Sequence, residues 1–302
     1  MHVRIANAPV SYGIYSPEEA SLPPDELLGT FQEQGYQGTD SGPLGYLGEG
    51  EALIRRLARH GLGLAGGWAD LRYGGDPEAF AADLRSLDHT LDVFTSVPVD
   101  AERFAPRPTL ACPADPERFA APGVPVDTGR QLADRDWEAF AADVQRAADR
   151  CRERGLEPVF HHHLGTAVET PEETRRLLSL TDISLCLDTG HWWLAGGDPV
   201  AAVAEFGPRI RQVHLKDADR AAHARVRRAG GDLWDVVAGG GFRALGEGDI
   251  DFAAVLGALR DVEYTGWLVV EQDAPPAPSA PDLDRITADQ RANRELLREK
   301  GL

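Results

Sequence analysis

The 302-residue chain has few cysteines, no long apolar run and a deficit of basic residues. Its three cysteines, Cys112, Cys151 and Cys186, stand far apart without a CxxC spacing, which argues against a disulfide framework or a cysteine zinc site. No apolar run approaches the roughly 18 residues of a membrane span, and the opening MHVRIANAPVSYG lacks the basic-then-apolar layout of a signal peptide. We therefore expect a cytoplasmic protein without a membrane partner.

The charge balance is strongly acidic. The chain carries 31 Lys and Arg against 49 Asp and Glu, a formal net charge of −18. Such a surface repels phosphate backbones, so we expect a small-molecule partner and no nucleic acid. Carboxylates are abundant as ligands for a divalent cation, but composition does not say which of the 49 would bind one.

Short β-rich runs, each followed by a longer stretch of helical periodicity, recur eight times along the chain. The predicted strands are His2–Asn7, Tyr36–Asp40, Leu62–Gly66, Pro108–Cys112, Glu157–His161, Ile183–Asp188, Ile210–Leu215 and Trp267–Glu271. The intervening stretches, such as 51–62, 137–156, 170–180 and 251–262, repeat apolar residues at i, i+3, i+4 and i+7. Strand then helix, eight times, predicts an α/β fold, a (β/α)₈ TIM barrel forming a single domain over residues 1–302.

Local signals support the boundaries between these units. Gly35, Gly61 and Gly155 each stand where a helix is expected to end, as a C′ glycine would. Thr170, followed by Pro171 and then by Glu173, is typical of an N-cap with a capping box. These signals place helix ends next to predicted strands, as the barrel requires.

The connections favour a barrel over a doubly wound sheet. The segment after the first strand, ANAPVSYG, is not the glycine-rich phosphate turn expected of a doubly wound fold. Two connections, 113–136 and 216–250, exceed the usual length and predict functional lids or binding loops. The last helix is expected at 284–302.

Histidine and carboxylate side chains gather at the predicted carboxyl ends of four consecutive strands, where barrels of this type place their chemistry. Because side chains alternate along a strand, apolar Val213 and Leu215 should face the helices and turn His214 toward the barrel axis. The same alternation turns a set of polar residues inward: His161, His163, Asp188, Lys216 and Glu271.

Strand alternation thus turns one oxygen or nitrogen donor from each of four residues toward the same point inside the barrel. These residues are Asp188, His214, Glu271 and His161. Two carboxylates with one or two imidazoles suit a divalent cation, and we expect Mn²⁺ or Co²⁺ before Mg²⁺, Fe²⁺ or Zn²⁺. A single Asp or Glu at a strand end can instead cap a helix or pair with a base. The joint placement on consecutive strands favours the metal.

Six sequence blocks carry a family resemblance. Three of them are DTGH at 188–191, VHLKD at 213–217 and VVEQD at 269–273; the others are ANAPVSYG at 6–13, GTDSGPLGY at 38–46 and HHHLGT at 161–166. The first three resemble blocks common to the xylose-isomerase-like barrel superfamily of sugar isomerases, epimerases and dehydratases. The other three are more specific for its inosose dehydratase group. The resemblance covers nearly the whole chain.

The resemblance implies a divalent metal held by Asp188, His214 and Glu271. His161 stands where the superfamily usually supplies a fourth ligand, a glutamate, which in the epimerases pairs with the strand-eight glutamate to move a proton between two faces of a carbon. With His161 there, proton abstraction on one face followed by loss of hydroxide fits better. Asp40 with Ser41 replaces a Glu-Leu pair, which shortens a carboxylate expected to contact substrate.

The chemistry implied by a metal and nearby histidines is elimination of water. A cation that chelates a ketone oxygen and its neighbouring hydroxyl stabilises the enediolate formed when the adjacent C–H loses its proton. His163 and His191 are the acid/base candidates, because histidine titrates near neutrality. Lys216 could stabilise the enolate, act as a base if burial lowers its pKa, or simply pair with a carboxylate. Glu271 has both a catalytic and a metal role in this scheme.

Recognition of a polyol needs hydrogen-bonding groups and an apolar platform for the ring. The candidate substrate-binding residues are Asn7, Ser11, Tyr12, Asp40, Trp68, Trp192 and Arg243. Each tryptophan could instead be plain packing, and an arginine in a long loop is more commonly a surface residue.

The sequence therefore predicts a metal-dependent dehydratase, a lyase, which removes water from a keto-cyclitol such as 2-keto-myo-inositol (scyllo-inosose) in inositol catabolism. One alternative is an isomerase or epimerase acting on a keto-sugar or a cyclitol. Another is a barrel that binds such a ligand without turnover. The oligomeric state stays open, although barrels of this type commonly form homo-oligomers.

Overall fold

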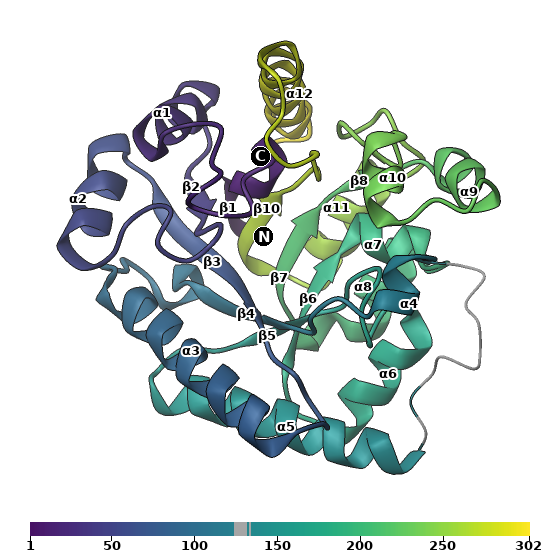
Figure 1. Cartoon of the computed structure of the whole chain (residues 1–302). Coiled ribbons are helices and arrows are strands. Elements are labelled where there is room, and N and C mark those ends of the chain that lie inside the picture. The colour runs from purple at the N-terminus through teal and green to yellow at the C-terminus, as the bar shows by residue number, and fades with distance from the viewer. Residues whose placement is uncertain (124–131, 133) are drawn as a thin grey trace.

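A computed structural model describes residues 1–123, 132 and 134–302 of the chain. Eight parallel strands close into a barrel, with helices around the outside (Figure 1), so the predicted (β/α)₈ fold is confirmed. Around the barrel the order is β1-β10-β7-β6-β5-β4-β3-β2. The strands are β1 His2–Asn7, β2 Gly38–Asp40, β3 Gly63–Asp70, β4 Arg107–Ala111, β5 Val159–His161, β6 Ser184–Asp188, β7 Ile210–Leu215 and β10 Thr265–Val270.

The larger helices follow the strands and cover the barrel wall. They are α1 Pro24–Gln34, α2 Gly50–His60, α3 Pro77–Ser96, α5 Asp134–Glu153, α6 Pro171–Leu180, α8 Pro199–Phe206, α11 Phe252–Asp261 and α12 Ala280–Glu299. The 3₁₀ turns are Pro9–Tyr12, Glu102–Phe104 and Gly207–Arg209. Within the described part of the chain, no helix combines the length and apolarity needed to cross a membrane.

The helix ends follow the predicted local signals. Gly35, Gly61 and Gly155 adopt φ values of 83°, 64° and 78°, the left-handed region that glycine enters at little cost. At the start of α6, the side chain of Thr170 accepts from the backbone N–H of Glu173, whose carboxylate accepts from the N–H of Thr170 in return. The capping box therefore fixes where α6 begins.

The two long connections differ from simple loops. Residues 216–250 contain a two-stranded antiparallel ribbon and two helices: β8 Asp217–Ala218, α9 Arg220–Arg228, α10 Leu233–Ala238 and β9 Phe242–Arg243. Short helices also follow β4 and β6, namely α4 Pro116–Phe119 and α7 Thr189–Leu194. The remainder of the expected 113–136 loop, residues 124–131 and 133, lies outside the described residues.

The barrel interior is packed below the site. Trp267 fills one end of it with small neighbours, and a Cβ on Gly38 or Gly63 would lie 2.5 or 3.0 Å from its ring. Nearer the carboxyl ends, Gln212 donates to the carbonyl of Ala65 and accepts from the hydroxyl of Thr109. The outward apolar residues of β7 pack under the helices, as the alternation predicts. These layers fill the barrel interior beneath its carboxyl-terminal mouth, where barrels of this type bind their ligands.

Candidate active site and metal centre

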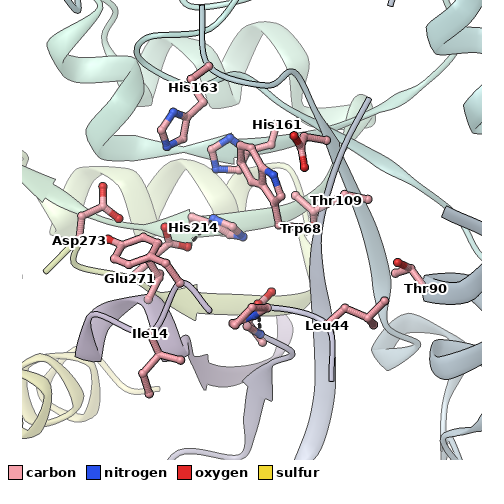
Figure 2. A pocket seen from close by; sticks show the side chains of 18 of the residues that line it. Ile14, Leu44, Trp68, Thr90, Thr109, His161, His163, His214, Glu271 and Asp273 are labelled. Atoms are coloured by element: carbon pink, nitrogen blue, oxygen red, sulfur yellow. Dashed lines mark hydrogen bonds and ion pairs between the residues drawn. The ribbon is translucent and has the colours of Figure 1, made fainter. Parts of the chain in front are cut away.

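A cavity of about 640 Å³ opens at the carboxyl ends of the strands. Its polar residues come from β2, β3, β4, β5, β7 and the end of β10, and Figure 2 shows several of them converging from different strands. Apolar side chains from the connecting segments form its outer wall: Val10, Ile14, Tyr15, Leu44, Leu71, Leu87, Phe119, Leu233, Trp234 and Val237. A polar end beneath an apolar mouth is the usual form of a small-molecule site.

Three predicted metal ligands meet in this region. Asp188 ends β6 and pairs in register with His214 of β7, while Glu271 directly follows β10. The Nδ1 atom of His214 lies 2.9 Å from Oε2 of Glu271 and 3.8 Å from Oδ2 of Asp188. One ligand atom from each residue lies within 4.8 Å of the other two. The spacing suits side chains that share one cation.

The donor atoms of this triad are buried and close together. Nδ1 of His214 pairs with Oε2 of Glu271 at 2.9 Å, and Oδ2 of Asp188 lies 3.4 Å from Nζ of Lys216. Among the described residues, Nε2 of His214 and Oδ2 of Asp188 have no hydrogen-bond partner, which is rare for buried polar atoms. Burial alone would raise the pKa of Asp188, but Lys216 and His161 hold it well below its usual range. Burial alone would lower the pKa of His214, but Cys186 and Glu271 hold it well above its usual value, so a cation that binds here would displace the proton of His214. Carboxylate oxygens and an imidazole nitrogen suit a divalent cation, so the residues fit a metal.

His161 lies beside the triad. Its Nε2 atom is 3.6 Å from Oδ2 of Asp188, its Nδ1 atom has no hydrogen-bond partner within the described chain, and the side chain faces the cavity. The structure thus brings all four predicted ligands together: His161, His214 and Glu271 line the cavity, and Asp188 is buried next to them.

Lys216 is fully buried and surrounded by carboxylates. Its Nζ atom lies 2.7 Å from Glu271, 3.0 Å from Asp273 and 3.4 Å from Asp188. Burial disfavours its charged form, yet these three carboxylates hold the pKa of Lys216 well above its usual value. The suggestion that burial makes Lys216 a base is therefore wrong, because the ion pairs outweigh desolvation. Lys216 also lies behind the cavity lining rather than in it.

The two candidate acid/base histidines occupy different positions. His163 lines the cavity, and its Nδ1 atom donates to the carbonyl of Leu164, 2.7 Å away, which leaves Nε2 with a free lone pair. His191 is fully buried behind it, with Nε2 accepting from Lys216 at 3.1 Å. Burial, followed by the effect of His161, lowers the pKa of His163 to about 3, and burial also lowers that of His191. Both rings are neutral, so the expectation that they titrate near pH 7 is wrong.

Asp40 and Trp68 both line the cavity as predicted. Asp40 ends β2, and burial raises its pKa to about 7 against the lowering effect of the Gly42 N–H that it accepts. Trp68 lies within β3 rather than after it, because β3 continues to pair with β4 as far as Asp70. Its indole is 40% exposed, and its ring centroid lies 5.5 Å from that of His161. Asp40 and Trp68 are placed to contact a ligand.

The other predicted substrate contacts near the first strand lie outside this cavity. Asn7 is fully buried and donates to Gln290 of α12. Ser11 accepts from the backbone N–H of Gln272, and Tyr12 is buried with its ring 5.7 Å from that of Phe31. These side chains hold the first strand and its turn against α12, the segment after β10 and α1, and none of them lines this cavity.

Trp192 and Arg243 also fall away from the cavity. The Trp192 ring is buried behind β5, 5.0 Å from the ring of His162, because α7 turns that face toward the helix layer. Arg243 lies on β9, where it pairs with Asp219 at 3.1 Å. Trp192 therefore packs beneath the helices and Arg243 belongs to the β8–β9 ribbon, and neither side chain lines this cavity.

Asp273 and Trp234 are among the cavity residues that the sequence analysis did not select. Asp273 lies two positions after Glu271, so strand alternation extended past β10 would have turned it toward the same side. Trp234 lies on α10, and its ring is 5.1 Å from that of Tyr15 across the mouth. No periodicity in the long 216–250 connection marks Trp234 as a cavity residue.

Comparison with known proteins agrees with this fold. A family model described as xylose isomerase-like TIM barrel matches residues 32–297. The rhizopine catabolism protein MocC of Rhizobium meliloti is 33% identical over 287 residues, which cover 93% of this chain and 85% of that protein. An inosose dehydratase of Geobacillus kaustophilus is 33% identical over 266 residues, covering 85% of this chain and 82% of that one.

Among solved structures, the IOLI protein with a bound zinc atom superposes with a TM-score of 0.68 at 13% identity, covering 96% of this chain and 97% of that chain. At that identity the likeness shows the shared fold. The extent of the family match, together with two relatives at 33% identity over most of their lengths, shows that the chain belongs to the xylose isomerase-like TIM barrel family.

Proposed function

We propose that the protein is a metal-dependent dehydratase that removes water from a keto-cyclitol such as 2-keto-myo-inositol. The observation that carries the proposal is the buried Asp188–His214–Glu271 triad at the floor of a cavity. The similarity to an inosose dehydratase supports the substrate class.

Asp188, His214 and Glu271 would hold the cation, with His161 beside them. A divalent ion bound there would supply Lewis-acid chemistry, by withdrawing charge from the ketone and hydroxyl oxygens of the substrate. Mn²⁺ or Co²⁺ fits this mixed oxygen and nitrogen set. The ammonium of Lys216 offsets part of the negative charge behind the site.

His163 is the proposed base. Its Nε2 lone pair is fixed by the donation of Nδ1–H to Leu164, so the ring is placed to take the proton from the carbon next to the ketone. Because burial lowers the pKa of His163 to about 3, this transfer would require that carbon to be acidified by the cation. Asp40 is the proposed acid, because its pKa of about 7 keeps much of it protonated at neutral pH. The β-hydroxyl takes the Asp40 proton as its C–O bond breaks and leaves as water. Trp68 supplies an apolar platform for the ring.

The test is conversion of 2-keto-myo-inositol by purified protein, stripped with a chelator and resupplied with Mn²⁺ or Co²⁺. Formation of the dehydrated diketone by the wild type and its loss in Asp188→Asn are expected. The control is Asp284→Asn on the exposed face of α12, which should convert substrate like the wild type. Metal-loaded wild type that leaves the inosose unchanged would exclude this substrate.

Epimerisation is the second candidate, and one observation favours it. Asp40 and His163 approach the cavity from β2 and from the end of β5, which lie on separate sides of the barrel, as a two-base mechanism needs. Deuterium from solvent entering a keto-sugar or cyclitol without loss of water would support epimerisation over dehydration. If the protein with its intact triad turned over no such ligand, the remaining alternative would be a barrel that binds the ligand without turnover.

A further inference from the structure

We infer that the chain contains a second metal site, formed by His161, Cys186 and His214, which takes a thiophilic divalent cation such as Zn²⁺ or Cd²⁺. One ligand atom from each of these residues lies within 4.8 Å of the other two. The site shares His214 with the proposed catalytic centre, but it has sulfur and nitrogen donors where the catalytic centre has mostly oxygens.

The barrel register brings these three side chains together. His161 and Cys186 are register partners on neighbouring strands β5 and β6, and β7 with His214 is the next strand. Cys186 lies two residues before Asp188, so it points to the same side of β6 one layer deeper. Gln212, its register partner on β7, donates across the barrel to the carbonyl of Ala65. The thiol is therefore the deepest donor below the cavity floor.

His161 and His214 place imidazole nitrogens beside the thiol. Within the described chain, Nδ1 of His161 and Nε2 of His214 have no hydrogen-bond partner, although the two residues are only 2% and 4% exposed, whereas Nδ1 of His214 pairs with Glu271. Both side chains line the cavity, which gives an ion a path inward from solvent. Cys186 is completely buried and forms no disulfide. Two imidazoles close to a protected thiol form a preorganised site.

The chemistry of the donor atoms determines which cation each of the two sites prefers. Thiolate and imidazole select Zn²⁺ and related soft ions, whereas carboxylates suit Mn²⁺ and Mg²⁺. Binding releases the thiol proton, and the sulfur then bonds the ion directly at about 2.3 Å in the case of zinc. Because His214 belongs to both sets, an ion at Cys186 shares this imidazole with Asp188 and Glu271. Occupation of one site therefore affects the affinity of the other.

The experiment titrates the metal-free full-length protein with Cd²⁺ and follows the ultraviolet charge-transfer absorption of the thiolate–metal bond. The wild type should develop this absorption with one equivalent, and Cys186→Ser should not. Cys112→Ser and Cys151→Ser are matched controls, because these cysteines are also buried and free, and both should retain the absorption. Loss of the thiolate ligand should weaken Cd²⁺ binding by at least roughly 10–100-fold, the range for perturbing a metal site's supporting groups.

A second measurement needs no substitution. X-ray absorption of zinc-loaded wild type should show one sulfur at about 2.3 Å together with nitrogen at about 2.0–2.1 Å. Absence of sulfur from the zinc shell, or charge-transfer absorption that persists in Cys186→Ser, would overturn the site. Glu271→Gln should abolish dehydration while keeping the absorption, so a failure of the proposed function and a failure of this site give different results.

Discussion

The Nζ atom of Lys216 lies 2.7 Å from Oε1 of Glu271, and Nδ1 of His214 lies 2.9 Å from Oε2 of the same carboxylate. Glu271 thus stands between a fixed cation and a metal-ligand candidate. Lys216 also contacts Asp188 and Asp273, so one ammonium faces three carboxylates. The three carboxylates carry more negative charge than Lys216 neutralises, and a divalent cation would balance the remainder. In the metal-free protein, the ammonium of Lys216 reduces the repulsion among these carboxylates.

Replacing Lys216 by methionine should destabilise the metal-free protein strongly. The substitution removes the ammonium that three buried carboxylates share, which costs about 3–5 kcal/mol in the free energy of unfolding. Urea denaturation in the presence of a chelator measures the change. The control is Lys300→Met, since Lys300 is the only other lysine and is exposed at the end of α12, and its effect should stay within about 0.5 kcal/mol. Equal effects of the two variants would contradict the charge argument.

Removing the metal should lower thermal stability. A ligand that binds only the folded state stabilises it by about 2.7 kcal/mol at 100 times its dissociation constant. Adding Mn²⁺ to chelator-treated protein should therefore raise the Tm in thermal unfolding. Asp188→Asn should lose most of this rise, because the variant replaces an ionised, unpaired donor by a neutral amide. An equal rise in Tm for the variant would show that the ion binds at a different site.

The barrel and the candidate metal ligands at its carboxyl end could be predicted from the sequence, because both follow from the periodicity of strands and helices. Strand alternation alone turns Asp188, His214 and Glu271 inward, and the structure brings them within 4.8 Å. Trp192 could not be placed this way, since its direction depends on how α7 turns back against β5. The direction of the pKa shift of Lys216 could not be predicted from the sequence either, because it depends on how burial is balanced against three carboxylates in the folded site.

Asp40 should make stability depend on pH. Its pKa is about 7 in the folded chain and about 3.9 when unfolded, so the folded state holds the proton more tightly between these values. The stability that this proton contributes is present at low pH and is lost as the pH rises through 7. The unfolding free energy of the wild type, measured relative to Asp40→Asn, should fall by about 2 kcal/mol from pH 5.5 to pH 8. Urea denaturation of metal-free protein measures it, and a constant difference would show that Asp40 does not titrate in this range.

Trp68 can act in two ways that kinetics separates. Its indole is 40% exposed to the cavity, which suits stacking on a substrate ring, but it also lies against His161 and His163, with ring centroids 5.5 and 5.4 Å away. If stacking dominates, Trp68→Ala should raise KM roughly 10-fold, about 1.4 kcal/mol, with kcat and Mn²⁺ affinity nearly unchanged, and Trp68→Phe should recover most of the loss. Trp193→Ala, outside the cavity, is the control and should leave KM unchanged. A fall in kcat together with weaker Mn²⁺ binding would show instead that Trp68 positions the two histidines, because only that role connects the indole to the metal and to the base.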